Sequence, residues 1–151
     1  MKKLLPILCS VVVLASIGGA FAIAEASTGT SHRFTGTFSV TRKVTSLVWQ
    51  HADPGTLSVG DRFEFTSNLV SQGDVIGHQG AVCTILHVRG DADAYECVGT
   101  YLLPGGTITA QAYRPANHPI SHVAITGGTG IYQDARGQIE FDGDTFTFEV
   151  S

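Results

Sequence analysis

Residues 122–141 read His-Val-Ala-Ile-Thr-Gly-Gly-Thr-Gly-Ile-Tyr-Gln-Asp-Ala-Arg-Gly-Gln-Ile-Glu-Phe, and this stretch decides the fold. Its first residues predict a strand, and its last four resume the period-2 alternation of a second strand. Between the two lie three glycines that we expect to supply positive φ angles and close backbone approach, Gly127, Gly128 and Gly130. The stretch therefore predicts a strand, a glycine-rich turn and a strand.

Period-2 segments recur through the rest of the chain roughly every ten to twelve residues, separated by Gly, Pro, Asp and Asn. The predicted strands cover residues 33–44, 62–70, 75–88, 94–103, 107–114, 121–127, 138–142 and 145–150. Residues 45–61 form the only long predicted connection. Eight strands joined mostly by short hairpins predict an all-β fold, a single eight-stranded antiparallel β-barrel. A closed sandwich is the alternative that the pattern leaves open.

The N-terminus has the pattern of a signal peptide, which we place at residues 1–26. Lys2 and Lys3 precede an apolar run, and small residues allow cleavage after Ala22 or Ala26. An uncleaved membrane anchor is the alternative, but the run is short for a span of about 20 residues. We therefore expect residues 27–151 to form the mature domain, in a secreted or periplasmic protein.

Charge and histidine placement argue against nucleic-acid and metal binding. After cleavage, 7 Lys and Arg face 12 or 13 Asp and Glu, and the cations form no basic stripe. His118 and His122 flank Pro119, whereas His78 and His87 point to opposite faces of one predicted strand. We expect no nucleic-acid partner and no metal.

Two cysteines remain after cleavage, Cys83 and Cys97, in a chain expected to reach an oxidising compartment. Both lie seven residues from Gly90, the centre of a predicted turn. A turn symmetric about Gly90 places them directly opposite each other in an antiparallel pair, within reach of a disulfide. Two free buried thiols are the alternative.

Alternation also predicts which side chains face the barrel interior. Odd positions of the second to fourth predicted strands share one face with the aromatic residues near the C-terminus. The predicted cavity-lining residues are Phe63, Phe65, Ser67, Leu69, Cys83, Ile85, Tyr95, Tyr101, Phe141 and Phe146. They either shape a ligand cavity or simply fill the barrel. His87, expected to face inward as well, is a candidate for acid–base help.

Four motifs in the same order resemble the allene oxide cyclase barrel, whose fold is shared with dirigent proteins. The motifs begin at Gly60-Asp61, Ile76-Gly77 and Tyr95-Glu96, and the last is Ala124–Tyr132. The resemblance implies an eight-stranded barrel, commonly a homotrimer, with an apolar cavity. It also implies binding of a small apolar molecule whose cyclisation or coupling the barrel steers without a cofactor.

Carried over position by position, the resemblance is incomplete at the site. Cys83 matches a cavity cysteine of the cyclases, and their cavity tyrosine aligns with Arg114, leaving Tyr113 one residue away. The glutamate of their first strand has no counterpart in residues 38–42, so allene oxide cyclisation itself is not implied. Tyr113 and His87 are the catalytic candidates. The alternative function is a non-catalytic carrier of lipophilic ligands or a filled structural barrel.

Overall fold

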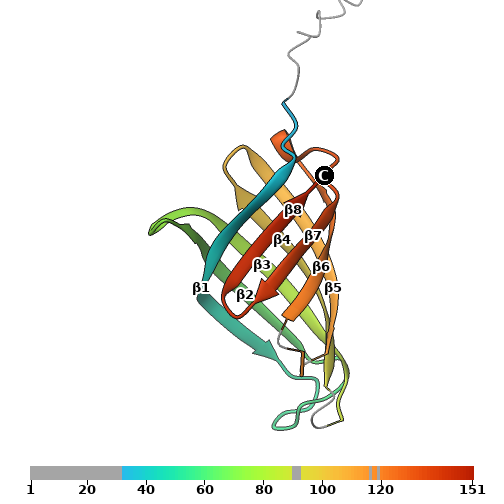
Figure 1. The fold of residues 1–151 in the computed structure, drawn as a ribbon. Coiled ribbons are helices and arrows are strands. Elements are labelled where there is room, and N and C mark those ends of the chain that lie inside the picture. The colour runs from blue at the N-terminus through green and yellow to red at the C-terminus, as the bar shows by residue number, and fades with distance from the viewer. Residues whose placement is uncertain (1–31, 90–92, 116, 119) are drawn as a thin grey trace, which may run out of the picture. The chain divides into compact units, whose positions relative to one another are not determined.

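The computed structural model describes residues 32–89, 93–115, 117–118 and 120–151, so the expected signal peptide lies outside the described residues. Eight antiparallel strands close into a barrel in chain order (Figure 1). They are β1 Gly36–Gln50, β2 Arg62–Ser71, β3 Asp74–His87, β4 Ala94–Leu103, β5 Gly106–Pro115, β6 Ile120–Gly128, β7 Gly137–Asp142 and β8 Thr145–Val150. The predicted barrel is confirmed, and the sandwich is not formed. No helix within the described ranges is long and apolar enough to span a membrane.

The strand bounds match the prediction closely except at β1, where the prediction was wrong. β1 continues to Gln50, so the expected connection 45–61 shortens to residues 51–61. The pairing of β1 with β2 shifts register between Val44 and Ser46, which marks a β-bulge. The bulge breaks the period-2 pattern, and this hides the second half of the strand in the sequence.

The glycine-rich turn forms between β6 and β7 and includes a short 3₁₀ helix, η2 Gly130–Tyr132. Gly130 has a φ of +62°, and a Cβ there would collide with the carbonyl oxygen of Gly105. A Cβ on Gly128 would collide with the carbonyl oxygens of Tyr132 and Thr107. Gly127 has neither a positive φ nor a close contact, so the expectation was wrong for this glycine.

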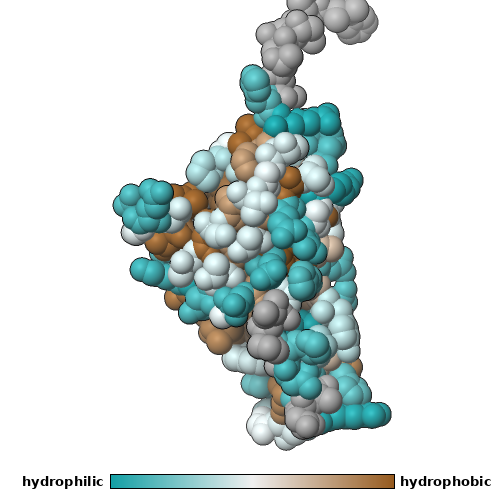
Figure 2. All heavy atoms as spheres, viewed as in Figure 1, coloured by the Kyte–Doolittle hydropathy of each residue, from teal (hydrophilic) through white to brown (hydrophobic). Residues whose placement is uncertain are grey.

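Large side chains fill the half of the barrel at which β1 begins and β8 ends. Phe148, Leu69, Ile108 and Ile139 are fully buried there. Phe38 stacks on Phe148 with ring centroids 4.6 Å apart, so aromatic packing closes this end. Other apolar residues reach the outer surface, where Figure 2 shows them as brown patches among hydrophilic side chains.

The contact that closes the barrel is short. β8 pairs with β1 only from Gly36 to Thr41, whereas β1 pairs with β2 as far as Gln50. β7 and β8 have six residues each, and their hairpin ends part-way along the longer strands (Figure 1). The inner faces of β2 to β5 therefore extend beyond the β7–β8 hairpin, and the barrel is open at this end.

Asp61 fixes the connection between β1 and β2. Its carboxylate accepts hydrogen bonds from the backbone N–H of Ala52 at 2.7 Å, from that of Ser58 at 3.0 Å and from Nδ1 of His51 at 2.9 Å. The side chain is fully buried. The Ala52 and His51 hydrogen bonds hold the pKa of Asp61 below its usual value, since they favour the charged carboxylate more than burial disfavours it.

The expected disulfide is present. Cys83 on β3 pairs directly with Cys97 on β4, with Cα atoms 4.1 Å apart. They lie directly opposite each other, as the turn symmetry predicts, and on the inward face, as the strand alternation predicts. The bridge excludes the alternative of two free thiols.

We expect the double variant Cys83→Ala/Cys97→Ala to lose about 3 kcal/mol of unfolding free energy, because the bridge restricts a short loop in the unfolded chain. Denaturant unfolding of the variant and of the wild type, with and without reductant, measures the loss. Equal stability of all four samples would contradict this expectation.

We expect Asp61→Asn to lower the free energy of unfolding at pH 7. The folded-state pKa of Asp61 is lowered, so its contribution is present above the unfolded pKa of about 4 and is lost as pH falls through the folded value. The difference between variant and wild type should therefore shrink on acidification. Asp53→Asn, at an exposed site of the same connection, is the matched control. A difference in unfolding free energy that does not change with pH would show that the charge of the Asp61 carboxylate does not stabilise the fold.

Candidate functional site

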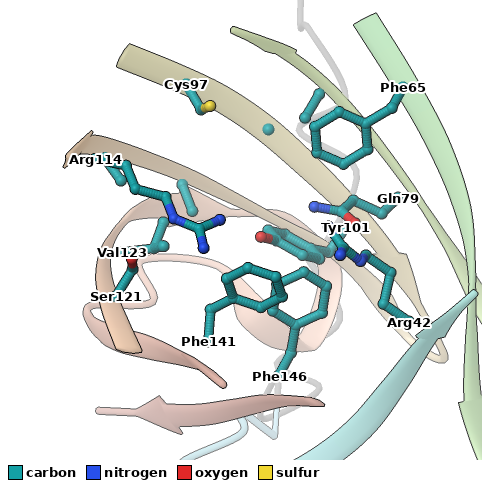
Figure 3. Close-up of a pocket in the computed structure, with 14 residues that line it drawn as sticks. Arg42, Phe65, Gln79, Cys97, Tyr101, Arg114, Ser121, Val123, Phe141 and Phe146 are labelled. Carbon is teal, nitrogen blue, oxygen red and sulfur yellow. The ribbon is translucent and has the colours of Figure 1, made fainter. Parts of the chain in front are cut away.

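A cavity of about 60 Å³ lies in the barrel interior on the open side of the packed core (Figure 3). All eight strands contribute to its wall. The lining residues are Arg42, Phe65, Gln79, Ala81, Cys97, Gly99, Tyr101, Ala110, Ala112, Arg114, Ser121, Val123, Phe141 and Phe146. This volume exceeds what one water needs, so a small chemical group fits inside.

The cavity exists because one wall is built from small residues. Ala81, Gly99 and Ala110 lie side by side across β3, β4 and β5. On another part of the wall Phe141 and Phe146, with centroids 4.9 Å apart, present aromatic rings. A barrel of eight strands is just wide enough to be filled by side chains, so a row of small ones leaves space.

Two arginine side chains reach into this apolar space. Arg42 comes from β1 and Arg114 from β5, and Figure 3 shows both guanidinium groups directed into the cavity. The Phe141 ring lies 4.7 Å from the guanidinium carbon of Arg42 and 4.6 Å from that of Arg114. Each contact is a cation–π interaction that offsets part of the cost of removing the charge from water.

Arg42 also lies beside the β7–β8 hairpin. Its backbone N–H donates to the carbonyl oxygen of Asp144 at 2.6 Å, and its Nη2 lies 3.2 Å from Asp144 Oδ1. The Asp144 side chain is 70% exposed. This ion pair therefore marks the edge of the cavity, at the residue where the pairing of β1 with β8 has just ended.

Several polar atoms of the wall lack partners. Among the described residues, five buried side-chain atoms have no hydrogen-bond partner, and four of them belong to the cavity wall. These four are Arg42 Nε, Arg114 Nε, Gln79 Oε1 and Ser121 Oγ. Buried polar groups are normally paired, so their concentration here indicates a place for a polar ligand group.

Tyr101 lies in the wall between the cavity and the packed core. Its ring packs edge to face on Phe146 and Phe148, with centroids 5.5 and 5.1 Å away. Burial raises the pKa of Tyr101 to about 12, and this outweighs the opposing effects of Gln79 and the Arg42 charge. The hydroxyl is therefore neutral at pH 7 and available as a hydrogen-bond donor.

Aromatic side chains continue from the cavity toward the open end. We call Trp49, Phe63 and Tyr95 the aromatic rim. Phe63 contacts both others, with centroids 4.7 Å from Trp49 and 5.4 Å from Tyr95, and lies 6.3 Å from Phe65 of the cavity wall. Trp49 is 43% exposed, so the rim joins the cavity to solvent.

The structure brings together part of the predicted site. Four predicted residues line the cavity, namely Phe65, Tyr101, Phe141 and Phe146. Phe63 and Tyr95 belong to the rim. Four others are buried in the barrel without lining the cavity, namely Ser67, Leu69, Cys83 and Ile85.

The two catalytic candidates lie outside the cavity. A register shift between Ile85 and His87 interrupts the alternation, and His87 is half-buried away from the cavity wall. Tyr113 is 63% exposed, while its neighbour Arg114 lines the cavity. No cluster of three or more metal-ligating side chains occurs in the part of the chain that the structure describes.

Arg42 and Arg114 are interior residues that the predicted cavity lining did not include, although the resemblance aligns a cavity tyrosine of the cyclases with Arg114. A signal was available, because Arg42 continues the inward positions of Phe38 and Val40, and Arg114 those of Ala110 and Ala112. Arginine is seldom buried without a partner, so composition alone favours an outward position.

The model of the allene oxide cyclase barrel like domain matches residues 40–145. The chain belongs to this family. The match covers β2 to β7 completely, most of β1 and the first residue of β8, in agreement with the resemblance of the sequence motifs. No curated protein matches the chain significantly in sequence.

Solved structures share this fold. Pyocyanin demethylase is 26% identical, with a TM-score of 0.72, over 76% of this chain and 99% of its own. The Diels-Alderase AbmU from Streptomyces koyangensis is 19% identical with a TM-score of 0.58, over 76% of this chain and 61% of its own. AbnU, an exo-specific intermolecular Diels-Alderase, is 18% identical with a TM-score of 0.56, over 76% of this chain and 94% of its own. The last two likenesses show the fold alone.

We expect the free energy of unfolding to fall as pH rises from 10 to 12, by up to about 3 kcal/mol from Tyr101. Its folded pKa lies above the unfolded value of 10, so its contribution is complete below pH 10 and is lost as pH approaches 12. Urea unfolding of Tyr101→Phe over this range should show a smaller loss than the wild type. Tyr113→Phe, at an exposed position, is the matched control, and equal slopes for wild type and Tyr101→Phe would contradict the assignment.

Proposed function

We propose that this barrel binds a small, largely apolar molecule in the cavity and steers its cyclisation or coupling. The observation that carries the proposal is the cavity with aromatic side chains in its wall, which the aromatic rim joins to solvent. Ligand sites in proteins are typically concave and apolar with a few placed polar groups. The cyclisation chemistry named for two proteins of the same fold supports a ring-forming reaction here.

Such a reaction requires mainly that the protein restrict the conformation of the substrate. A ring closure proceeds when a flexible chain is held with its reacting carbons close together, and this restriction alone lowers the barrier substantially. Phe65, Phe141 and Phe146 would pack against the substrate, and the neutral Tyr101 hydroxyl would donate to an oxygen that gains charge. This proposal needs no acid–base relay.

A non-catalytic carrier is the second candidate function. The residues that line the cavity include no carboxylate and no histidine, so its wall offers no ordinary general acid or base. The filled structural barrel is the least favoured of the three functions, because a cavity is present beside the packed core.

Export and assembly stay predictions. A disulfide is typical of oxidising compartments, which supports a secreted or periplasmic protein. A homotrimer is what the family resemblance implies, and we propose it on that ground.

We expect Ala112→Leu to abolish ligand binding with little change in stability, because the added carbons occupy the cavity instead of solvent. Ala112 lines the cavity and is half-buried. Trp49 is the only tryptophan of the chain and lies on the rim, so its fluorescence reports binding. A series of lipophilic dienes, terpenoids and phenols provides the ligands.

Ala124→Leu is the matched control, since Ala124 is exposed and lies outside the cavity wall. The same ligands should bind this variant as they bind the wild type. Products from a tethered diene–dienophile substrate then separate the two functions. A stereoisomer ratio that differs from the spontaneous one, and reverts in Ala112→Leu, supports catalysis. Binding with the spontaneous ratio indicates the carrier, and absence of binding refutes both.

A further inference from the structure

We propose that the ligand of this cavity carries a single anionic group, a carboxylate on a conjugated or aromatic skeleton, bound between the guanidinium groups of Arg42 and Arg114. This inference rests on the proposed function, because it names the chemistry of the molecule bound in the same cavity. It goes beyond that function, which by itself asks only for a small and largely apolar ligand.

The cavity wall carries two positive charges and no negative charge. Arg42 and Arg114 project into the same space from different strands (Figure 3), and the lining residues include no Asp or Glu. Among the described residues, the only acid paired with either arginine is Asp144, which lies at the exposed edge. These three groups together leave one positive charge, so a monoanion would neutralise the site.

The arginine nitrogens need an acceptor. The Nε atoms of Arg42 and Arg114 are buried and have no hydrogen-bond partner among the described residues. A buried N–H group without an acceptor costs free energy, and the two contacts with Phe141 offset only part of that cost. A carboxylate is planar and accepts two N–H bonds from one guanidinium, so it fits this requirement better than a neutral carbonyl or hydroxyl.

The remaining wall fits a conjugated skeleton. Phe65, Phe141 and Phe146 offer ring surfaces, and Ala81 and Gly99, which lie beside Phe65 in the sheet, leave room for the ligand. A cavity of about 60 Å³ holds the charged end and its first carbons. The rest of the molecule would lie along the aromatic rim, where Phe63 and Tyr95 are half-buried.

The attraction would be local. The full chain has a formal net charge of −4, so the protein as a whole does not attract anions. A preference for an anion over its neutral analogue must therefore come from the two arginines in the cavity. This separates the proposal from general surface electrostatics.

The test compares 4-fluorocinnamate with 4-fluorocinnamyl alcohol, which have the same skeleton and differ in charge. Binding of each to the full-length protein is followed by ¹⁹F NMR at pH 7, where the carboxylate is ionised. We expect the wild type to bind the carboxylate at least about tenfold more tightly than the alcohol, as charge-assisted hydrogen bonds favour. Arg114→Gln should remove this preference, so that the ratio of the two dissociation constants falls to about one.

Two further variants keep the test decisive. Arg114→Lys retains the charge and should retain part of the preference, which shows that loss in Arg114→Gln is not a folding defect. Arg62→Gln removes a charge from an exposed position of β2 and should leave the preference unchanged. Thermal melts followed by circular dichroism check that each variant is folded.

Equal affinity for the two probes would overturn the anion proposal while leaving cavity binding, and hence the proposed function, intact. An equal loss of preference in Arg62→Gln and Arg114→Gln would also overturn it, because the effect would then come from overall charge. If neither probe binds, the anion proposal fails, and the lipophilic ligand series with Ala112→Leu judges the proposed function separately.

Discussion

The pairing of β8 with the first six residues of β1 is the contact on which the rest of this structure depends. It closes the sheet, so no strand edge is left at the packed end of the barrel. Because it stops at Thr41, the second half of β1 continues beside β2 alone. The same contact thus closes one half of the barrel and opens the other. Arg42 is the first residue beyond it, which places a charged side chain where packing gives way to solvent.

The packed half and the hollow half have different side chains at equivalent inward positions. Phe148, Leu69, Ile108 and Ile139 fill the first, while Ala81, Gly99 and Ala110 line the second. Burial of large apolar groups supplies most of the stability of a small domain. Burial in the packed half can therefore stabilise the barrel enough to offset the free-energy cost of the polar atoms without partners in the cavity wall.

Much of the fold was predictable from the sequence, because strands with one buried face repeat with period 2 and their turns need Gly, Pro or Asp. The pairing of Cys83 with Cys97 was also predictable, because residues at equal distance from the centre of a symmetric hairpin turn face each other. The extension of β1 and the position of His87 were not predictable, since a bulge shifts the alternation at each place. The aromatic part of the site followed from alternation. Its two arginines follow the same alternation, but arginine is seldom buried, so residue type argued against an inward position that only the assembled barrel explains.

The bridge between Cys83 and Cys97 has a chemical consequence for the cavity wall, to which Cys97 belongs. The nucleophilic form of cysteine is the thiolate, and a cysteine in a disulfide cannot form a thiolate. An electrophilic ligand such as an epoxide or a quinone methide would therefore not alkylate Cys97 in the cavity wall. Oxidation of this cysteine pair thus removes the thiol nucleophile from this part of the cavity wall.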